Sequence, residues 1–327
     1  SGAFNDIAEI VQKRISSQGI GFGAPLPKTD EKADLLKHIK SEDLIQFGFE
    51  SEFVGRLPVR AVFEYLDETD LYKILKNPNN PITLGKKLDF AAYGIDVKFE
   101  DKALQALARE AAKENTGARG LVSAVERALL LYEKRLPSTN LRKFPITVTL
   151  VDSPANTFEH MTNMLDDSDW ESTFERLVQE EKNGIRSYIT ANKNHIASKY
   201  QMDMPSSRID IVADQYSKNA TDISRIIKKI KTYYDEIKAI ELRFLKSHDV
   251  NLVMEDSAID HVIKNIFGSK INLKELFKQL SDDFEYGLKL VRDKTGRNRF
   301  FITREALLAP EKFIESLIKD KLQIDES

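Results

Sequence analysis

Two stretches of the chain share one pattern of apolar and acidic residues, and this repeat constrains the fold more than any other feature. Residues 250–276 can be laid over residues 95–121 without a gap, so that Glu255 and Asp256 fall on Glu100 and Asp101. Each stretch begins with the alternation typical of a strand and continues with apolar residues at helical spacing. The repeat indicates that one supersecondary unit occurs twice. Two unrelated units with similar strand and helix patterns remain the alternative.

The first of these units is predicted to run from helix to strand, then through two helices to a closing strand. Residues 67–76 predict a helix capped by Asp67 or Thr69, and residues 95–100 alternate as a strand with Asp96, Lys98 and Glu100 on its polar side. Apolar stripes predict helices in DKALQALAREAAKEN and in ARGLVSAVERALLLYEKRLP. Short strands are expected at 59–65 and at 144–152.

The second unit and the segment before it follow the same logic. FFIT from Phe300 resembles FPIT from Phe144 after a shift of one residue, and DISRIIKKIK from Asp222 resembles DETDLYKILK. Residues 153–220 are expected to be mainly helical, with Trp170 and neighbouring apolar residues as a core stripe. The fold class predicted for the whole chain is therefore α+β and mainly helical.

Composition excludes several classes of function. A chain of 327 residues with 41% hydrophobic and 31% charged residues is long enough for two or three compact domains. Its formal net charge of -3 argues against a nucleic-acid or membrane-surface partner. The absence of cysteine excludes disulfides and a thiol nucleophile, and the five scattered histidines predict no metal site. No segment is apolar enough to predict a membrane span.

The stretch Gly-Ile-Gly-Phe-Gly-Ala-Pro at residues 19–25 places two bulky apolar side chains on a predicted loop. Three glycines and a proline oppose both helix and strand, so Ile20 and Phe22 are poorly placed to join a core of their own. One interpretation is a small cluster tucked under the loop. The other is that a second protein receives these side chains.

Two arginines, Arg119 and Arg56, lie at positions that suggest a role in binding. Arg119 falls in the predicted first turn of a helix, where exposed N–H groups favour an anion, so its guanidinium is suited to meet a phosphate there. Pairing with Glu114 is the simpler alternative. Arg56 lies on a stiff Gly-Arg-Leu-Pro turn that could present it to a neighbouring molecule.

Several of these motifs agree with one known family. GIGFGA, EDLIQFGFESEFVGRLPV, the helix ending in NPNNP, GIDVKFEDKAL and TGARGL occur in an order and spacing that closely resemble the C-terminal half of the ClpX family of AAA+ unfoldases, of the Clp/Hsp100 group. The resemblance covers about residues 1–152. It implies a parent protein that is an ATP-binding hexamer in the cytoplasm, which unfolds protein substrates for a ClpP-type peptidase in regulated proteolysis.

The resemblance also assigns roles to particular residues. Ile20, Gly21 and Phe22 look like the tripeptide of the loop that docks on the peptidase ring. Arg56 looks like the arginine finger that acts on the ATP site of the next subunit, and Arg119 like the sensor-2 arginine. Gly2-Ala3-Phe4 looks like the segment that follows the sensor-1 strand.

This chain also departs from the family pattern. It contains no G-x-x-x-x-G-K-[ST] sequence and no acidic Walker B strand, and the nearest fragment is Leu-Gly-Lys-Lys at 84–87. Without a phosphate-binding loop the chain alone should not hydrolyse ATP, and no cofactor is expected in it alone. ATP and Mg²⁺ are expected in a full-length parent, of which this chain is expected to be a C-terminal fragment.

The predicted organisation has four parts. Residues 1–62 would finish the AAA+ large domain, and residues 63–152 would form the small domain, or lid. Residues 153–220 would form a helical connection and residues 221–327 a diverged second lid-like domain, in which Lys274 matches Arg119 and Arg208 roughly parallels Arg56.

Two other functions fit the sequence. The AAA+ pieces could serve as a non-enzymatic scaffold whose doubled lid binds partners. They could also belong to an ATP-driven remodeller that works without a peptidase.

Overall fold

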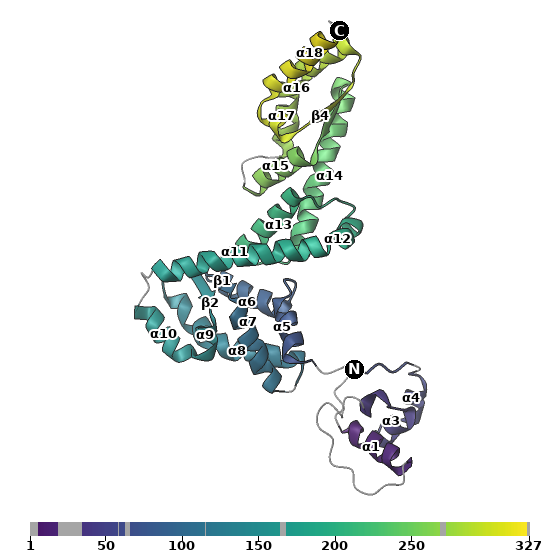
Figure 1. The fold of residues 1–327 in the computed structure, drawn as a ribbon, viewed down its shortest axis with the longest axis vertical. Coiled ribbons are helices and arrows are strands. Elements are labelled where there is room, and N and C mark those ends of the chain that lie inside the picture. The colour runs from purple at the N-terminus through teal and green to yellow at the C-terminus, as the bar shows by residue number, and fades with distance from the viewer. Residues whose placement is uncertain are drawn as a thin grey trace.

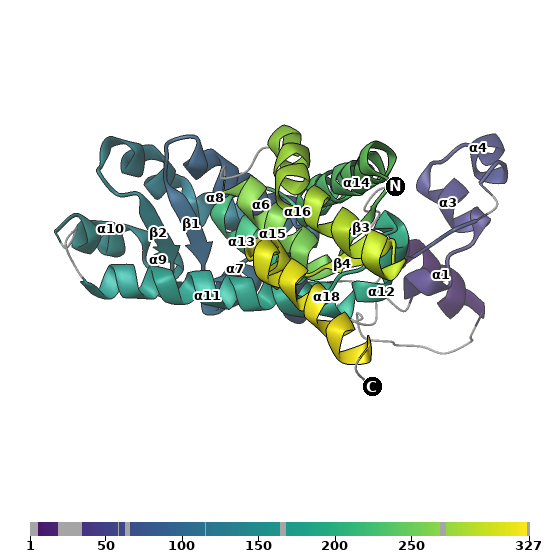
Figure 2. The ribbon, with the colours of Figure 1, turned by 90° about the horizontal axis from the view of Figure 1, so that it is seen from above.

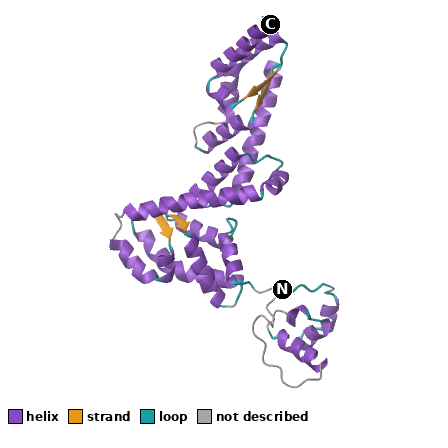
Figure 3. Ribbon diagram, viewed as in Figure 1, coloured by secondary structure: helices purple, strands orange, loops and turns teal. Residues whose placement is uncertain are grey.

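The computed structural model describes residues 6–18, 35–57, 59–62, 66–114, 116–163, 168–268 and 273–325. The predicted loop residues Ile20, Gly21 and Phe22 and the opening Gly2-Ala3-Phe4 lie outside these ranges. The described residues form a mainly helical structure with two small sheets, which confirms the predicted fold class (Figures 1 and 3).

The helices described before the first predicted unit lie apart from the rest of the described residues (Figure 1). They are α1 (Ile7–Gln18), α3 (Ser41–Phe47) and α4 (Ser51–Gly55). The Arg14 guanidinium joins α1 to α3 through two hydrogen bonds, of 2.7 and 2.8 Å, to the buried carboxylate of Asp43. Burial alone would raise the pKa of Asp43, but the bonds from Arg14 and from the Lys40 N–H hold it below its usual value.

The first unit contains two parallel strands and the helices around them. Its elements are α5 (Glu68–Lys76), α6 (Pro81–Ala91), β1 (Asp96–Phe99), α7 (Asp101–Lys113), α8 (Ala118–Arg135), the short 3₁₀ helix Leu136–Ser138, β2 (Lys143–Ile146), α9 (Val148–Asp152) and α10 (Pro154–Asn163). Strand β1 pairs with β2 in parallel, and α7 and α8 make the crossover between them. Such a crossover is what parallel strands require.

One core holds the first unit together. Its members run from Leu71 to Phe158, and its centre is a group of aromatic rings from Phe90, Tyr132, Phe144 and Phe158. Helix α5 starts as predicted, because the Asp67 side chain accepts a hydrogen bond from the Asp70 N–H. The Ala and Leu stripe of α7 is buried against this core.

The rest of the chain begins with a long helix that crosses the first unit (Figure 1). The elements are α11 (Ser168–Ala191), α12 (Lys193–Tyr200), α13 (Ser206–Lys218), α14 (Ile223–His248), β3 (Asn251–Met254), α15 (Asp256–Phe267), α16 (Leu273–Thr295), β4 (Arg299–Ile302), α17 (Arg304–Leu308) and α18 (Pro310–Asp325). A second core of buried residues runs from Ile185 in α11 to Leu307 in α17.

The two sheets have the same construction. In each, a strand is followed by two helices, a parallel second strand and a five-residue helix. The backbone N–H of Glu100 donates to the Ile146 carbonyl at 2.9 Å, and the N–H of Glu255 donates to the Ile302 carbonyl at the same distance. The chain from β3 to β4 is one residue longer than the chain from β1 to β2, since Phe99 pairs with Ile146 and Met254 pairs with Ile302. This difference agrees with the one-residue shift between FPIT and FFIT.

Several predicted details are wrong. The strand expected at 144–152 ends at Ile146, because the chain turns into α9 after Thr147. Residues 59–62 form no regular element. Helix α6 was not expected from the sequence. Arg208 does not parallel the exposed Arg56, since it is fully buried and bonded to Asp256 and Asp260 at 2.8 Å each.

Candidate functional site

Arg119 lies in the first turn of α8, between two glycines that fix its position. Gly117 adopts φ 63° and ψ −142°, a conformation open only to glycine. A Cβ on Gly120 would lie 2.8 Å from the carbonyl oxygen of Ala111, so glycine is needed for α8 to pack closely on α7. The intervening Arg119 is exposed. The Thr-Gly-Ala-Arg-Gly sequence therefore holds a cation at the start of a helix.

The charges around Arg119 leave it available to a ligand. The first turn of α8 carries no acidic residue. Glu114, the partner that the simpler alternative requires, instead forms an ion pair with Arg127. Among the described residues, no ion pair or hydrogen bond of the Arg119 side chain is found.

Arg56 directly follows α4 and points into solvent. Its side chain is 78% exposed, and it bonds Glu52, which is 77% exposed, at 2.7 Å. A solvent-exposed pair spaced i, i+4 contributes only about 0.3–0.5 kcal/mol, so this contact would yield readily to a better anion. The two arginines are not brought together, since α4 and α8 lie in separate parts of the molecule (Figure 1).

A second candidate site lies where α11 crosses the sheet of the first unit. Lys98 is only 3% exposed, although the strand alternation places it on the polar face. Its ammonium lies 2.6 Å from the Ser217 carbonyl oxygen, 3.0 Å from Asp96 and 3.1 Å from Glu181. Lys87 of α6 also pairs with Glu181. Glu181 of α11 thus forms ion pairs with two lysines of the first unit.

More bonds along α11 and α13 reinforce this junction. The Trp170 indole N–H donates to the Lys143 carbonyl at 2.9 Å, which agrees with its prediction as a core aromatic. The Tyr216 hydroxyl of α13 donates to the Pro78 carbonyl at 3.1 Å. Burial, and then the nearby Glu181 carboxylate, raise the pKa of Tyr216, so the phenol remains neutral and able to donate.

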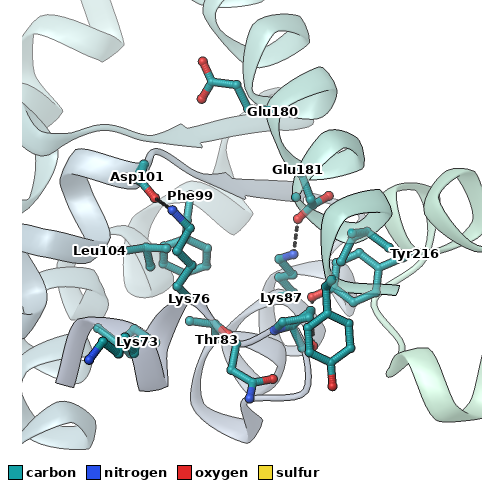
Figure 4. A pocket seen from close by; sticks show the side chains of 16 residues that line it. Lys73, Lys76, Thr83, Lys87, Phe99, Asp101, Leu104, Glu180, Glu181 and Tyr216 are labelled. Carbon is teal, nitrogen blue, oxygen red and sulfur yellow. Dashed lines mark hydrogen bonds and ion pairs between the residues drawn. The ribbon is translucent and has the colours of Figure 1, made fainter. Parts of the chain in front are cut away.

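A pocket of about 440 Å³ opens beside this junction (Figure 4). Its apolar wall includes Phe99 and Leu104, and ion pairs Lys76–Asp101 and Lys87–Glu181 lie on its two sides. Gly184 of α11 also lines it, and a Cβ there would meet nothing within 4 Å. Sequence reasoning missed this pocket, because its walls come from segments about a hundred residues apart.

Comparison with known proteins identifies the class of the first unit. Residues 66–135 match the family described as the C-terminal, D2-small domain of ClpB protein. This stretch contains α5 to α8 and β1, the elements that position Arg119. Most of the first unit is therefore similar to that small domain.

The relatives narrow this class further. The chain is 38% identical over 144 residues to the ATP-dependent Clp protease ATP-binding subunit ClpX of Treponema denticola, which covers 43% of this chain and 35% of that protein. It is 40% identical over 156 residues to the proteins of the same name from Borrelia duttonii and Borrelia recurrentis, covering 48% of this chain and 36% of each. Just under half of the chain is thus similar to these ClpX subunits, and the matched stretch spans just over a third of their length.

Two further findings concern the described residues only. No helix among them is both long and apolar enough to cross a membrane. No group of three or more His, Asp or Glu side chains among them is placed to hold a metal ion.

The Lys98 contacts predict a large effect of one substitution. Lys98→Ala should lower the free energy of unfolding by about 3 kcal/mol, because it leaves Glu181 without one of its two cations in a buried site. Lys73→Ala is the matched control, since Lys73 is 68% exposed and its ion pair with Asp70 lies in solvent. Urea unfolding of both variants measures the difference, and equal losses would contradict the structural role of Lys98.

The Asp101 carboxylate predicts a pH effect. Burial would raise its pKa, but bonds from Lys76 at 2.8 Å and from the Tyr72 hydroxyl at 2.7 Å hold it below the ordinary value of 3.8. Because the pKa is lower in the folded state, this stabilisation is present above about pH 4 and is lost as the pH falls further. Urea midpoints measured from pH 7 to pH 3 should therefore fall more steeply for the parent chain than for Asp101→Asn. Parallel curves would argue against this contribution.

Proposed function

We propose that this chain supplies the C-terminal part of an ATP-dependent protein unfoldase subunit, which delivers protein substrates to a ClpP-type peptidase. The active form would be a cytoplasmic homo-hexamer that uses ATP and Mg²⁺. The AAA+ small domain and the similarity to ClpX subunits support this proposal. The phosphate-binding loop would come from residues that this chain lacks.

The observation that carries the proposal is the position of Arg119. An exposed guanidinium in the first turn of α8 adds its charge to that of the free N–H groups there, and both favour a phosphate. Its role would be that of sensor 2, in which the lid of a subunit contacts the nucleotide of the same subunit. Movement of the lid on ATP hydrolysis would then be passed to the substrate.

Arg56 would act on the ATP site of the neighbouring subunit. Its weak pairing with Glu52 leaves the guanidinium free to move, and an arginine finger stabilises the charge that develops on the transferred phosphoryl group. Ile20, Gly21 and Phe22 would dock on the peptidase, and this role rests on the sequence alone.

We also propose the domain limits predicted from the sequence. Residues 1–62 would complete the large domain, 63–152 form the lid, 153–220 connect, and 221–327 form a second lid-like domain. The matching strand, helix and strand order of the two units supports the last assignment. This second domain would not contact nucleotide.

The nucleotide roles are tested in the full-length protein. Arg119→Ala should lower ATP turnover at least tenfold, and Arg56→Ala by about 10³-fold, the range expected for a lost arginine finger. Arg127→Ala and Glu52→Ala are the matched controls, because they remove the neighbouring ion pairs and should leave turnover within a few-fold. Turnover that stays near the parent value in Arg119→Ala would overturn the proposal.

The docking role is tested separately. Replacing Ile20 and Phe22 by Ser should abolish peptidase-coupled degradation of a protein substrate while ATP turnover continues, because only the contact with the peptidase is removed. Val59→Ser is a suitable control, since Val59 is an apolar residue that is 82% exposed in the segment after α4. Loss of ATP turnover together with degradation would indicate that Ile20 and Phe22 belong to a core instead.

A further inference from the structure

The two sheets differ in what covers them. Because side chains alternate along a strand, each sheet has one face toward its core and one outer face. The outer face of the first sheet carries Asp96, Lys98, Lys143 and Pro145. The outer face of the second sheet carries the corresponding Asn251, Val253, Arg299 and Phe301.

Helix α11 covers the first outer face. Lys98 and Pro145 are buried beneath it, and its aromatic and aliphatic stripe of Trp170, Phe174 and Leu177 faces inward. At the edge of this contact, the Lys143 ammonium lies 2.8 Å from Glu171 and 2.9 Å from Glu175, one turn apart on α11. The first outer face therefore binds an amphipathic helix whose acidic residues pair with a lysine at the edge of the sheet.

The second outer face is left open. Phe301 is 41% exposed, whereas the corresponding Pro145 is buried. Helix α14 packs beside β3, where Lys238 donates to the Met254 carbonyl and Glu241 accepts from the Met254 N–H. In the described part of the chain, no helix crosses β3 and β4 as α11 crosses β1 and β2 (Figures 1 and 2).

The charge of the second outer face is also suited to an acidic partner. Arg299 takes the place of Lys143, and its guanidinium lies 5.0 Å from the centre of the Phe301 ring. Arg297 precedes Arg299 and Arg304 follows it closely along the chain, and both are exposed. No carboxylate among the described residues forms an ion pair with Arg299.

We propose that the second outer face binds an acidic amphipathic helix of a partner protein, in the way that the first outer face binds α11. The apolar stripe of that helix would pack on Val253 and Phe301. Acidic residues one turn apart would pair with Arg299, as Glu171 and Glu175 pair with Lys143. Such a site would let the second unit select an adaptor or a substrate, whatever the nucleotide chemistry of the first unit.

The probe for this site is a labelled synthetic peptide with the sequence of α11, Ser168–Ala191. It should bind the full chain saturably in fluorescence anisotropy, and Phe301→Glu should weaken binding at least tenfold, because a charge would replace the central apolar contact. Tyr286→Glu is the matched control, since Tyr286 is 82% exposed on α16 of the same unit, and it should leave binding unchanged.

A charge swap distinguishes specific ion pairing with Arg299 from nonspecific binding of the peptide. Arg299→Glu should weaken binding of the parent peptide, and a peptide with Glu171→Arg and Glu175→Arg should recover it. Absence of saturable binding, or binding that Phe301→Glu leaves intact, would overturn the proposal. Self-association of the parent chain in sedimentation that Phe301→Glu abolishes would also overturn it, because the occupant would then be a second copy of the chain.

Discussion

The buried ammonium of Lys98 is the interaction on which the arrangement of this molecule depends. A lysine can be buried only where its charge is met, and here a carbonyl of α13 and the carboxylates of Asp96 and Glu181 meet it. Glu181 also forms an ion pair with Lys87, so one carboxylate of α11 binds both a helix and a strand of the first unit. The small domain and the C-terminal region are consequently held together by partially desolvated charges, and apolar packing around Trp170 adds to them.

Local signals in the sequence were sufficient for much of the small domain. Asp67 marks the start of α5, and the alanine-rich stripe marks α7. Thr-Gly-Ala-Arg-Gly indicates an arginine at a helix start. Gly117 supplies the positive φ before the helix, and Gly120 allows the helix to pack closely on its neighbour. These features depend on residues close in sequence, and so a single sequence reveals them.

Features that depend on distant segments were not predictable in this way. The strand alternation around Lys98 is that of a lysine facing solvent. Lys98 is buried because α11 and α13, which are distant in sequence, pack over it. In the sequence, Asn80 and Pro81 suggest only the end of a helix. In the structure they are the cap and the first residue of α6. The alternation after Ile146 suits a strand and a short helix equally, and packing against α7 decides for the helix α9. The pocket beside Gly184 is formed where four segments distant in sequence meet.

Helix α11 is shared by both cores, with Trp170 packed against the first and Ile185 and Ile189 buried in the second. At 24 residues it is about 36 Å long and has no break along its course. Its contacts with the first unit run from Trp170 to Tyr188, whose hydroxyl accepts a hydrogen bond from the Asn79 side chain at 3.0 Å, so the helix is fixed to that unit along most of its length. A displacement of the first unit would thus be transmitted through α11 to the second core.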